Sequence, residues 1–366
     1  VRIQNKAGGI IQTVSLTAFW TTPTTGLNGT PFDPHVIYDT LSGRWIAACA
    51  ANGKSANSQI WLAVSATSDP TGLWHFYSFS ADATGTYWAD YPGLGVNSKW
   101  IAITANMFPV AGGPSPGIQM WVVDKSTALN GGALTVKNFA LGFTKYYTMI
   151  PAVVRDAAEP NLYFVNTGFS ANQKTVDLIA LSQITGTAAN PVWSPVPDAA
   201  GPFPGTGLFK APVPFNTTLT CGAPGTSGRS VVCGQQLGSA KLLEGGDSRI
   251  INVVFRNGKL WFSHGGGLPN EPAKPTRMAA FWYEVDPLLL NTTGNPVVQS
   301  GVIDAGVAGS AIAFPSIAVN KNNDVVVGFS RMDSTRYVEA AFVSRRATDP
   351  LGAMSAIQVI KVGEAP

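Results

Sequence analysis

Residues 59–65 read QIWLAVS, an apolar run of strand length that ends in a small polar residue. Four later stretches repeat this pattern and end in Ser or Asp: IQMWVVD at 118–124, VDLIALS at 176–182, AAFWYEVD at 279–286 and EAAFVS at 339–344. Their last residues lie 59, 58, 104 and 58 positions apart. A period of this length is typical of architectures that place one small β-sheet in each repeat.

Each repeat reads as four strands separated by Gly, Asn, Asp and Pro turns. The first repeat contains FDPHVIYD, GRWIAACA, QIWLAVS and the more amphipathic WHFYSFS. Nearly continuous apolar strands fit sheets that are buried on both faces. The sequence therefore predicts an all-β fold, a single β-propeller domain over residues 1–366 with five recognisable four-stranded blades. The five repeats cover about residues 32–81, 88–141, 148–199, 243–304 and 311–361.

Two segments break the period. Residues 199–243 exceed one repeat and contain CGAPGTSGRSVVC, which predicts an insertion closed by a Cys221–Cys233 disulfide. Two free thiols are the alternative, whereas Cys49 is expected to be a small buried apolar residue. A hairpin is predicted over residues 1–20. It would belong to an incomplete sixth blade that closes the ring, or it would be a flap on a five-bladed ring.

The composition narrows the class of protein. Charged residues make up 12% of the chain, against about 25% in an average protein, and the net charge is +3 without a basic run. A nucleic-acid partner is therefore not expected. No stretch approaches the roughly 18 apolar residues of a membrane span. The Thr, Ser, Asn and Gly content, together with the predicted disulfide, favours a secreted or cell-surface protein.

Several segments occur in a familiar order: FDPHVIYDTLSGRWI, AVSATSDPTGLWHFYSF, ADYPGLGV and GDSRIINVVFRNGKLWFSH. Together they resemble a family of largely uncharacterised secreted bacterial β-propeller proteins, over most of the chain. The resemblance implies the propeller, a sixth blade and a chain that is trimmed or incomplete, but no activity. SDPTGLW at 68–74 and TDPLGAM at 348–354 are weakly similar to the Asp-box turn of sialidase-type propellers, with altered spacing. Such turns are structural, because Asp accepts backbone N–H bonds and Gly supplies a positive φ.

Three carboxylates, Asp33, Asp90 and Asp247, fall at or just before the predicted first strands of their repeats. They are accompanied by His35, Tyr91 and Arg249, respectively. Converging carboxylates could act as general acid and base on a glycosidic bond. His, Tyr and Arg could instead abstract a sugar proton and neutralise a uronate, as a polysaccharide lyase requires. The oxygens could also hold a structural Ca²⁺, or each Asp could simply cap a turn. No other cofactor is expected.

Other candidates for ligand contact are His264, beside three glycines, and the neighbours Tyr87 and Trp88. A Gly turn permits close approach of a ligand, and an exposed aromatic ring can stack on a sugar. Trp88 is expected in a loop before its strand. Trp45, Trp100 and Trp261 recur at one position of the second strands and are expected to be core. His264 could equally be structural.

Three functions remain open at this stage. The first is a secreted propeller that recognises a glycan or another extracellular ligand, or serves as a scaffold. The second is a polysaccharide-active hydrolase or lyase that uses Asp33, His35, Asp90, Asp247 and Arg249. The third is a self-assembling component of an extracellular structure.

Overall fold

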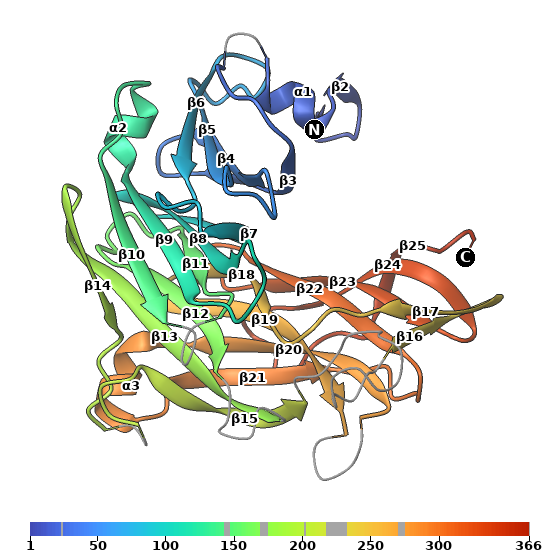
Figure 1. The fold of residues 1–366 in the computed structure, drawn as a ribbon. Helices are drawn as coiled ribbons and strands as arrows, with labels where there is room; N and C mark the ends of the chain where they lie inside the picture. Colours follow the sequence, from blue (N-terminus) through green and yellow to red (C-terminus); the bar gives the residue numbers. More distant parts are fainter. Residues whose placement is uncertain are drawn as a thin grey trace. The chain divides into compact units, whose positions relative to one another are not determined.

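The computed structural model describes residues 1–22, 25–142, 147–168, 175–200, 203–216, 233–269 and 275–365. Most of these residues lie in β-strands (Figure 1), which confirms the prediction of a mostly β chain. The chain divides into two compact units. Unit 1 comprises Val1–Leu162 and Ile184–Trp193, and unit 2 comprises Tyr163–Gln183 and Ser194–Pro366.

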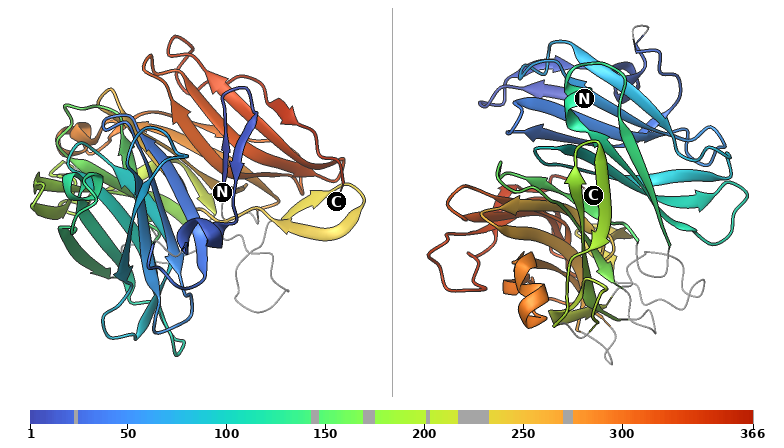
Figure 2. Two further views of the ribbon diagram at one scale, coloured as in Figure 1. Left: turned by 90° about the horizontal axis from the view of Figure 1, so that it is seen from above. Right: turned by 90° about the vertical axis from the view of Figure 1, so that its left-hand side faces the viewer.

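Unit 1 contains two four-stranded antiparallel sheets whose strands pair in chain order. The first sheet consists of β3 (Pro31–Asp39), β4 (Arg44–Ala51), β5 (Gln59–Ser65) and β6 (Trp74–Ser80). The second consists of β7 (Tyr87–Val96), β8 (Trp100–Pro109), β9 (Gly117–Asp124) and β10 (Val136–Gly142). Buried residues of both sheets, such as Leu62 and Val123, form one hydrophobic cluster. The sheets therefore pack on each other, as the two views of Figure 2 show.

The N-terminal segment covers the other face of the first sheet. β1 (Arg2–Gln4) and β2 (Ile10–Thr13) form a hairpin, and α1 (Leu16–Trp20) follows with Ser15 as its N-cap. The Trp20 side chain is 1% exposed and packs on Trp61. This segment thus buries apolar side chains of β4 and β5 that would otherwise face water.

The rest of unit 1 includes α2 (Lys125–Leu129) and β11 (Ile150–Val154). β11 lies parallel to β7 and pairs with it at Val153 and Val96. Three further strands contain residues of both units: β12 (Leu162–Gly168), β13 (Thr175–Thr187) and β14 (Asn190–Pro195).

Unit 2 contains two more antiparallel sheets with the same strand order. The first consists of β18 (Ile250–Arg256), β19 (Lys259–Leu268), β20 (Arg277–Val285) and β21 (Val297–Ile303). The second consists of β22 (Ala311–Val319), β23 (Val325–Asp333), β24 (Arg336–Arg345) and β25 (Gln358–Lys361). Unit 2 also holds the helix α3 (Pro287–Thr293), the hairpin of β16 (Cys233–Gln236) and β17 (Ser239–Glu244), and β15 (Leu208–Asn216). β15 pairs antiparallel with residues 175–180 of β13.

The tryptophans of the second strands behave largely as expected. Trp100 and Trp261 have no exposed surface, so both are core residues. Trp45 is only half-buried, and its indole N–H donates to the carbonyl oxygen of Ser68 at 3.0 Å. Trp45 therefore anchors the SDPTGLW turn to its own sheet.

A bulge recurs in the first strand of all four sheets. The strand register is interrupted between Phe32 and His35 in β3, and similar breaks occur in β7, β18 and β22. In β3, β7 and β22 a residue with positive φ directly precedes a proline. The three pairs are Asp33-Pro34, Tyr91-Pro92 and Phe314-Pro315, with φ of 47°, 57° and 52°. Proline has no N–H to give to the ladder, so the bulge accommodates it and turns the preceding side chain away from the regular alternation.

The close approach of β11 to β7 requires glycine at position 95. A Cβ added there would lie 2.6 Å from both the carbonyl oxygen of Ala152 and the Cβ of Pro151. We expect Gly95→Ala to lower the free energy of unfolding by about 1–3 kcal/mol, because the backbone of β11 must shift. Gly142→Ala is the control, since a Cβ at Gly142 meets no atom within 4 Å. Urea denaturation of both variants measures the difference, and equal stabilities would contradict this packing.

Candidate functional site

The N-terminal ends of β3 and β7 bring four of the predicted side chains together in unit 1. β3 supplies Asp33 and His35, and β7 supplies Asp90 and Tyr91. The rings of His35 and Tyr91 meet edge to face, with their centroids 6.0 Å apart and their planes at 85°. The sequence therefore identified residues that the fold places side by side, although 56 positions separate His35 from Tyr91.

The backbone at this site is strained on both strands. Asp33 and Tyr91 occupy the left-handed region, with φ of 47° and 57°, and neither is glycine or asparagine. Each also precedes a proline, whose ring restricts the conformation of the residue before it. Non-glycine residues in this region cost of order 1–3 kcal/mol and are concentrated at functional sites. The same conformation recurs at Phe314-Pro315 in unit 2, so it is a repeated feature of the first strands.

His35 is the titratable group best suited to chemistry. Burial lowers the pKa of the imidazole below its usual value of 6.5, so the ring is neutral at pH 7. Within the part of the chain that the structure describes, neither ring nitrogen forms a hydrogen bond, and the edge contact with Tyr91 is the ring's one aromatic partner. A neutral imidazole with an uncommitted nitrogen can accept a proton.

The two carboxylates differ in their surroundings. The Asp90 Oδ1 accepts a hydrogen bond of 2.8 Å from the backbone N–H of Tyr91. Asp33 is exposed, and its carboxylate has no hydrogen-bond or ion-pair partner among the described residues. Asp90 is therefore held in place by the bulge, whereas Asp33 is free to approach a ligand.

Aromatic side chains border the same end of unit 1. Trp88 and Phe108 face each other across β7 and β8, with ring centroids 5.3 Å apart. Gly53 lets a third ring come close, since a Cβ there would lie 3.0 Å from Phe32 and 3.5 Å from Trp88. All three rings are half-buried, so each keeps some surface for a ligand. The prediction that Trp88 lies in a loop is wrong, because β7 already begins at Tyr87 and pairs Trp88 with Phe108.

The remaining acidic candidate belongs to unit 2 and is already paired. Asp247 and Arg249 form a bidentate ion pair, with the Arg249 Nη2 2.6 Å and the Nε 2.7–2.9 Å from the carboxylate oxygens. Asp247 also precedes β18 by three residues, whereas Asp33 and Asp90 lie inside β3 and β7. The three carboxylates therefore do not occupy equivalent positions, and the Asp247 carboxylate acts as the counter-ion of Arg249.

His264 does not present itself to a ligand. Its ring has no exposed surface and lies parallel to Phe281 and near-parallel to Tyr283, at 5.2 and 5.5 Å. Nδ1 lies 2.8 Å from the carbonyl oxygen of Gly265, so Nδ1 carries the proton and donates it, and Nε2 accepts from the Tyr283 hydroxyl at 3.1 Å. The interpretation of His264 as a ligand-binding residue is therefore wrong, and the structural interpretation fits.

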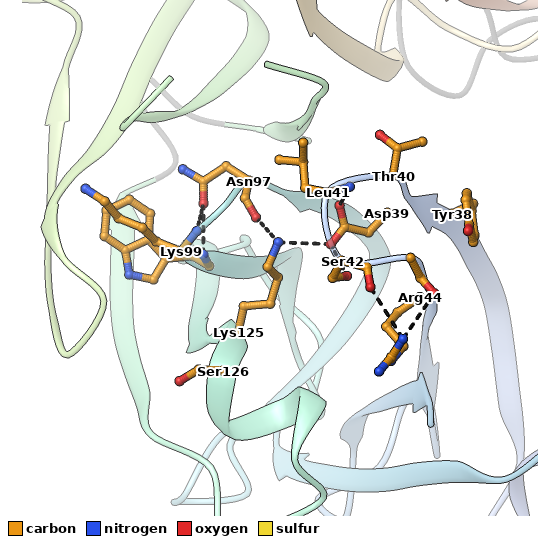
Figure 3. A network of polar contacts seen from close by, with 12 residues as sticks. Tyr38, Asp39, Thr40, Leu41, Ser42, Arg44, Asn97, Lys99, Lys125 and Ser126 are labelled. Atoms are coloured by element: carbon orange, nitrogen blue, oxygen red, sulfur yellow. Dashed lines mark hydrogen bonds and ion pairs between the residues drawn. The ribbon is translucent and has the colours of Figure 1, made fainter. Parts of the chain in front are cut away.

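The sequence analysis missed a buried ion pair at the opposite ends of β3 and β7 (Figure 3). The Lys125 Nζ lies 2.9 Å from the Asp39 Oδ2 and 2.5 Å from the carbonyl oxygen of Asn97, and both charged side chains are at most 5% exposed. Asp39 also accepts from the N–H of Leu41 and the hydroxyl of Ser42. The sequence gives little signal of this pair. Lys125 directly follows the apolar strand 118–124, at a position where a solvent-exposed lysine is ordinary.

Other predictions have a mixed outcome. Cys221 lies outside the described residues, so the Cys221–Cys233 disulfide stays a prediction, and Cys49 is buried and free as expected.

No group of three or more His, Cys, Asp or Glu side chains among the described residues is arranged to hold a metal ion. No helix in the described part of the chain is long and apolar enough to cross a membrane.

Comparison with known proteins leaves the family open. No family model matches the sequence, and no curated protein sequence matches it. Among solved structures, the chain is similar to a Trypanosoma rangeli sialidase in complex with the inhibitor DANA, with 10% identity, a TM-score of 0.43 and coverage of 100% of this chain and 52% of that chain. It therefore spans about half the length of that sialidase.

Two other solved structures show similar values. The polysaccharide lyase Uly1 has 9% identity and a TM-score of 0.43, covering 86% of this chain and 58% of that chain. An ACO/RPE65 chimera has 9% identity and a TM-score of 0.49, covering 99% of this chain and 67% of that chain. These scores are too low to carry an argument about function.

The buried ion pair gives a sharp prediction about stability. We expect Lys125→Met to lower the free energy of unfolding by about 3–5 kcal/mol, because it leaves the Asp39 carboxylate buried without its counter-ion. The double variant Lys125→Met with Asp39→Leu should recover part of that loss. Lys361→Met is the control, since the pair of Lys361 and Glu364 is exposed and should matter little. Guanidinium denaturation tests the series. A Lys125→Met variant as stable as the control would contradict a stabilising role for the buried ion pair of Asp39 and Lys125.

His264 makes the stability of unit 2 depend on pH. Burial lowers its pKa to about 4, against 6.5 for the free side chain. The folded state therefore binds the proton more weakly than the unfolded state. Its contribution is fully present above pH 6.5 and is lost as the pH falls from 6.5 towards 4, by about 3 kcal/mol in total.

We expect His264→Gln to flatten the stability curve in this pH interval, because glutamine can donate to Gly265 but does not titrate. Thermal or urea unfolding of wild type and variant between pH 4 and pH 8 measures the difference. His75→Gln, in the outer strand β6 of unit 1, serves as the histidine control. Parallel curves for wild type and His264→Gln would rule out the buried neutral imidazole.

Proposed function

We propose that the chain is a carbohydrate-active enzyme whose site lies at the N-terminal ends of β3 and β7. The observation that carries the proposal is the pairing of His35 with Tyr91, in which the imidazole is partly buried and its nitrogens bind none of the described residues. In His264 of unit 2, by contrast, both ring nitrogens have hydrogen-bond partners within the fold. The uncommitted nitrogen of His35 is suited to accept a proton from a water or a sugar hydroxyl.

The charges around this pair favour hydrolysis over elimination. In unit 1 the charged side chains on the two bulges are the carboxylates of Asp33 and Asp90. They would repel a uronate, and the Arg249 guanidinium that the lyase hypothesis requires is neutralised by Asp247. Carboxylates instead stabilise the positive charge that develops on a sugar ring during glycosidic bond cleavage. The substrate class that fits is therefore a neutral glycan.

The roles follow from the surroundings of each group. His35, neutral at pH 7, takes the proton of the attacking water. Asp90, fixed by the N–H of Tyr91, faces the developing positive charge as a carboxylate. Asp33, exposed and unpaired among the described residues, supplies the second carboxyl group, which in its protonated form donates its proton to the leaving oxygen, while the proton taken up by His35 returns to solvent. Trp88 and Phe108 offer the flat apolar surface on which a sugar ring packs.

Glycan recognition without turnover is the second candidate. It is favoured by the half-buried aromatic border of Phe32, Trp88 and Phe108, which needs no reaction to explain it. In that case His35 would donate or accept a hydrogen bond to a sugar hydroxyl. The two candidates share one site and differ only in whether new reducing ends appear.

The finer features of the fold are proposed together with the site. We propose that the four-stranded sheets are blades of a β-propeller that the N-terminal hairpin helps to close. The parallel neighbours β7 with β11 and β20 with β22, which belong to successive repeats, support this arrangement. We also propose that the protein is secreted or displayed at the cell surface, on the strength of its few charges and the predicted disulfide.

The test is the release of reducing ends from a panel of neutral polysaccharides. We expect His35→Ala to lower the rate by about 10²–10⁴-fold, because a general base is removed, and Asp33→Asn to lower it strongly. His75→Ala, in the same unit but on β6, should retain full activity. Since the pKa of His35 is lowered by burial, activity should persist at pH values below 6.5 and fall only as the ring is protonated.

The possible outcomes separate the candidates. Release that is lost with His35→Ala and kept with His75→Ala supports hydrolysis. Binding of a glycan in affinity electrophoresis without any release supports recognition alone. Release that is unchanged in His35→Ala and Asp33→Asn would sink the proposed site.

A further inference from the structure

A small hollow in unit 1 lies on the other face of β7 from Trp88. Its volume is about 280 Å³, and it is lined by Tyr87, Met107, Ile118, Gln119, Leu141 and neighbouring residues. Successive side chains of a strand point to opposite faces, so Tyr87 faces this hollow while Trp88 faces Phe108. The hollow and the His35 site therefore share the N-terminal end of β7.

The polar groups of the hollow include two that have no hydrogen-bond partner among the described residues. Neither the Tyr87 hydroxyl nor the Gln119 carboxamide forms a hydrogen bond with a described residue, and both side chains are half-buried. Polar groups that the described fold leaves without a partner bind water, which the hydroxyl group of a ligand can replace. Gln119 can both donate and accept, which suits the hydroxyl groups of a sugar.

The position of Tyr87 is fixed before any ligand binds. The Asp82 Oδ2 accepts hydrogen bonds from the backbone N–H groups of Thr86, at 2.9 Å, and Tyr87, at 3.1 Å, and from the Thr84 hydroxyl. These bonds hold the turn that leads into β7. A pre-organised aromatic ring binds with less loss of conformational entropy than a mobile one.

We propose that this hollow is a second sugar subsite, which takes one further ring of a neutral glycan whose neighbouring residues lie at the His35 site. The volume of about 280 Å³ lies just below the usual range for small-molecule sites, roughly 300–1,000 Å³, so the hollow takes no more than one sugar ring. Met107 provides apolar surface for the ring carbons, and Gln119 and Tyr87 bind its hydroxyls. This inference rests on the proposed carbohydrate-active function.

The test measures binding as a function of chain length. The probes are neutral β-linked glucose, xylose and galactose oligomers of two to six units, labelled at the reducing end and titrated by fluorescence anisotropy. We expect wild type to gain affinity when the oligomer becomes long enough to reach the hollow. Gln119→Ala and Tyr87→Phe should lose about threefold to tenfold of that gain, the value of one hydrogen bond. Both should leave the binding of the shorter oligomers unchanged.

Two further variants keep the result interpretable. Tyr87→Ala removes the whole ring and should abolish the gain, but Tyr87 also packs on the core, so its unfolding midpoint is measured in parallel. Asn138→Ala removes an exposed amide on the neighbouring strand β10, outside the hollow, and should behave as wild type.

The outcomes distinguish this inference from the function on which it rests. If His35-dependent release persists but Gln119→Ala and Tyr87→Phe bind long oligomers as Asn138→Ala does, the subsite is overturned and the proposed function stands. If affinity falls equally for short and long oligomers, the hollow is not a separate subsite and the inference also fails. If wild type binds none of the oligomers, both proposals fail.

Discussion

The buried ion pair between Asp39 and Lys125 is the constraint on which the candidate site depends. Taking two charges out of water costs several kcal/mol per ion, and their attraction offsets this only when the remaining polar atoms are also satisfied. Here the remaining polar atoms are satisfied, since Asn97 accepts from the lysine while Leu41 and Ser42 donate to the aspartate. The pair joins the C-terminal end of β3 to the segments that flank the second sheet. Apolar packing alone would allow the two sheets to slide, whereas a buried ion pair has one geometry.

The buried ion pair and the candidate site lie at opposite ends of the same two strands, β3 and β7. Asp39 ends β3 and Asn97 follows β7, while His35 and Tyr91 lie near the starts of those strands. A contact that holds one end of two packed strands together also restricts movement at the other end, where His35 meets Tyr91. The strained backbone at Asp33 and Tyr91 is consistent with this view, because strain persists only where the surroundings over-determine the conformation.

The sequence predicted the fold better than it predicted the site. Strand-length apolar runs with a regular period define the four sheets of the two units, since that signal is local and repeated. The same local reasoning failed for Trp88 and His264. Trp88 follows a Gly- and Thr-rich stretch and resembles a loop residue, yet cross-strand pairing with Phe108 extends β7 to include it. His264 lies beside glycines, which predicted access for a ligand, but the rings of Phe281 and Tyr283 lie against the imidazole and it has no exposed surface.

The carboxylates show why a site is harder to derive than a repeat. Asp33, Asp90 and Asp247 were equivalent by their position before an apolar run, but side-chain direction depends on register, and a bulge changes it by one residue. Two of the three are placed on the bulges of neighbouring strands, and the third has a guanidinium partner two residues away. Burial also disfavours the charged form of the His35 imidazole, so the pKa of His35 is lowered. The contact of this imidazole with Tyr91 joins two strands that are far apart in the sequence, and it depends on the bulges and on burial. No single one of these residues reveals that arrangement in the sequence.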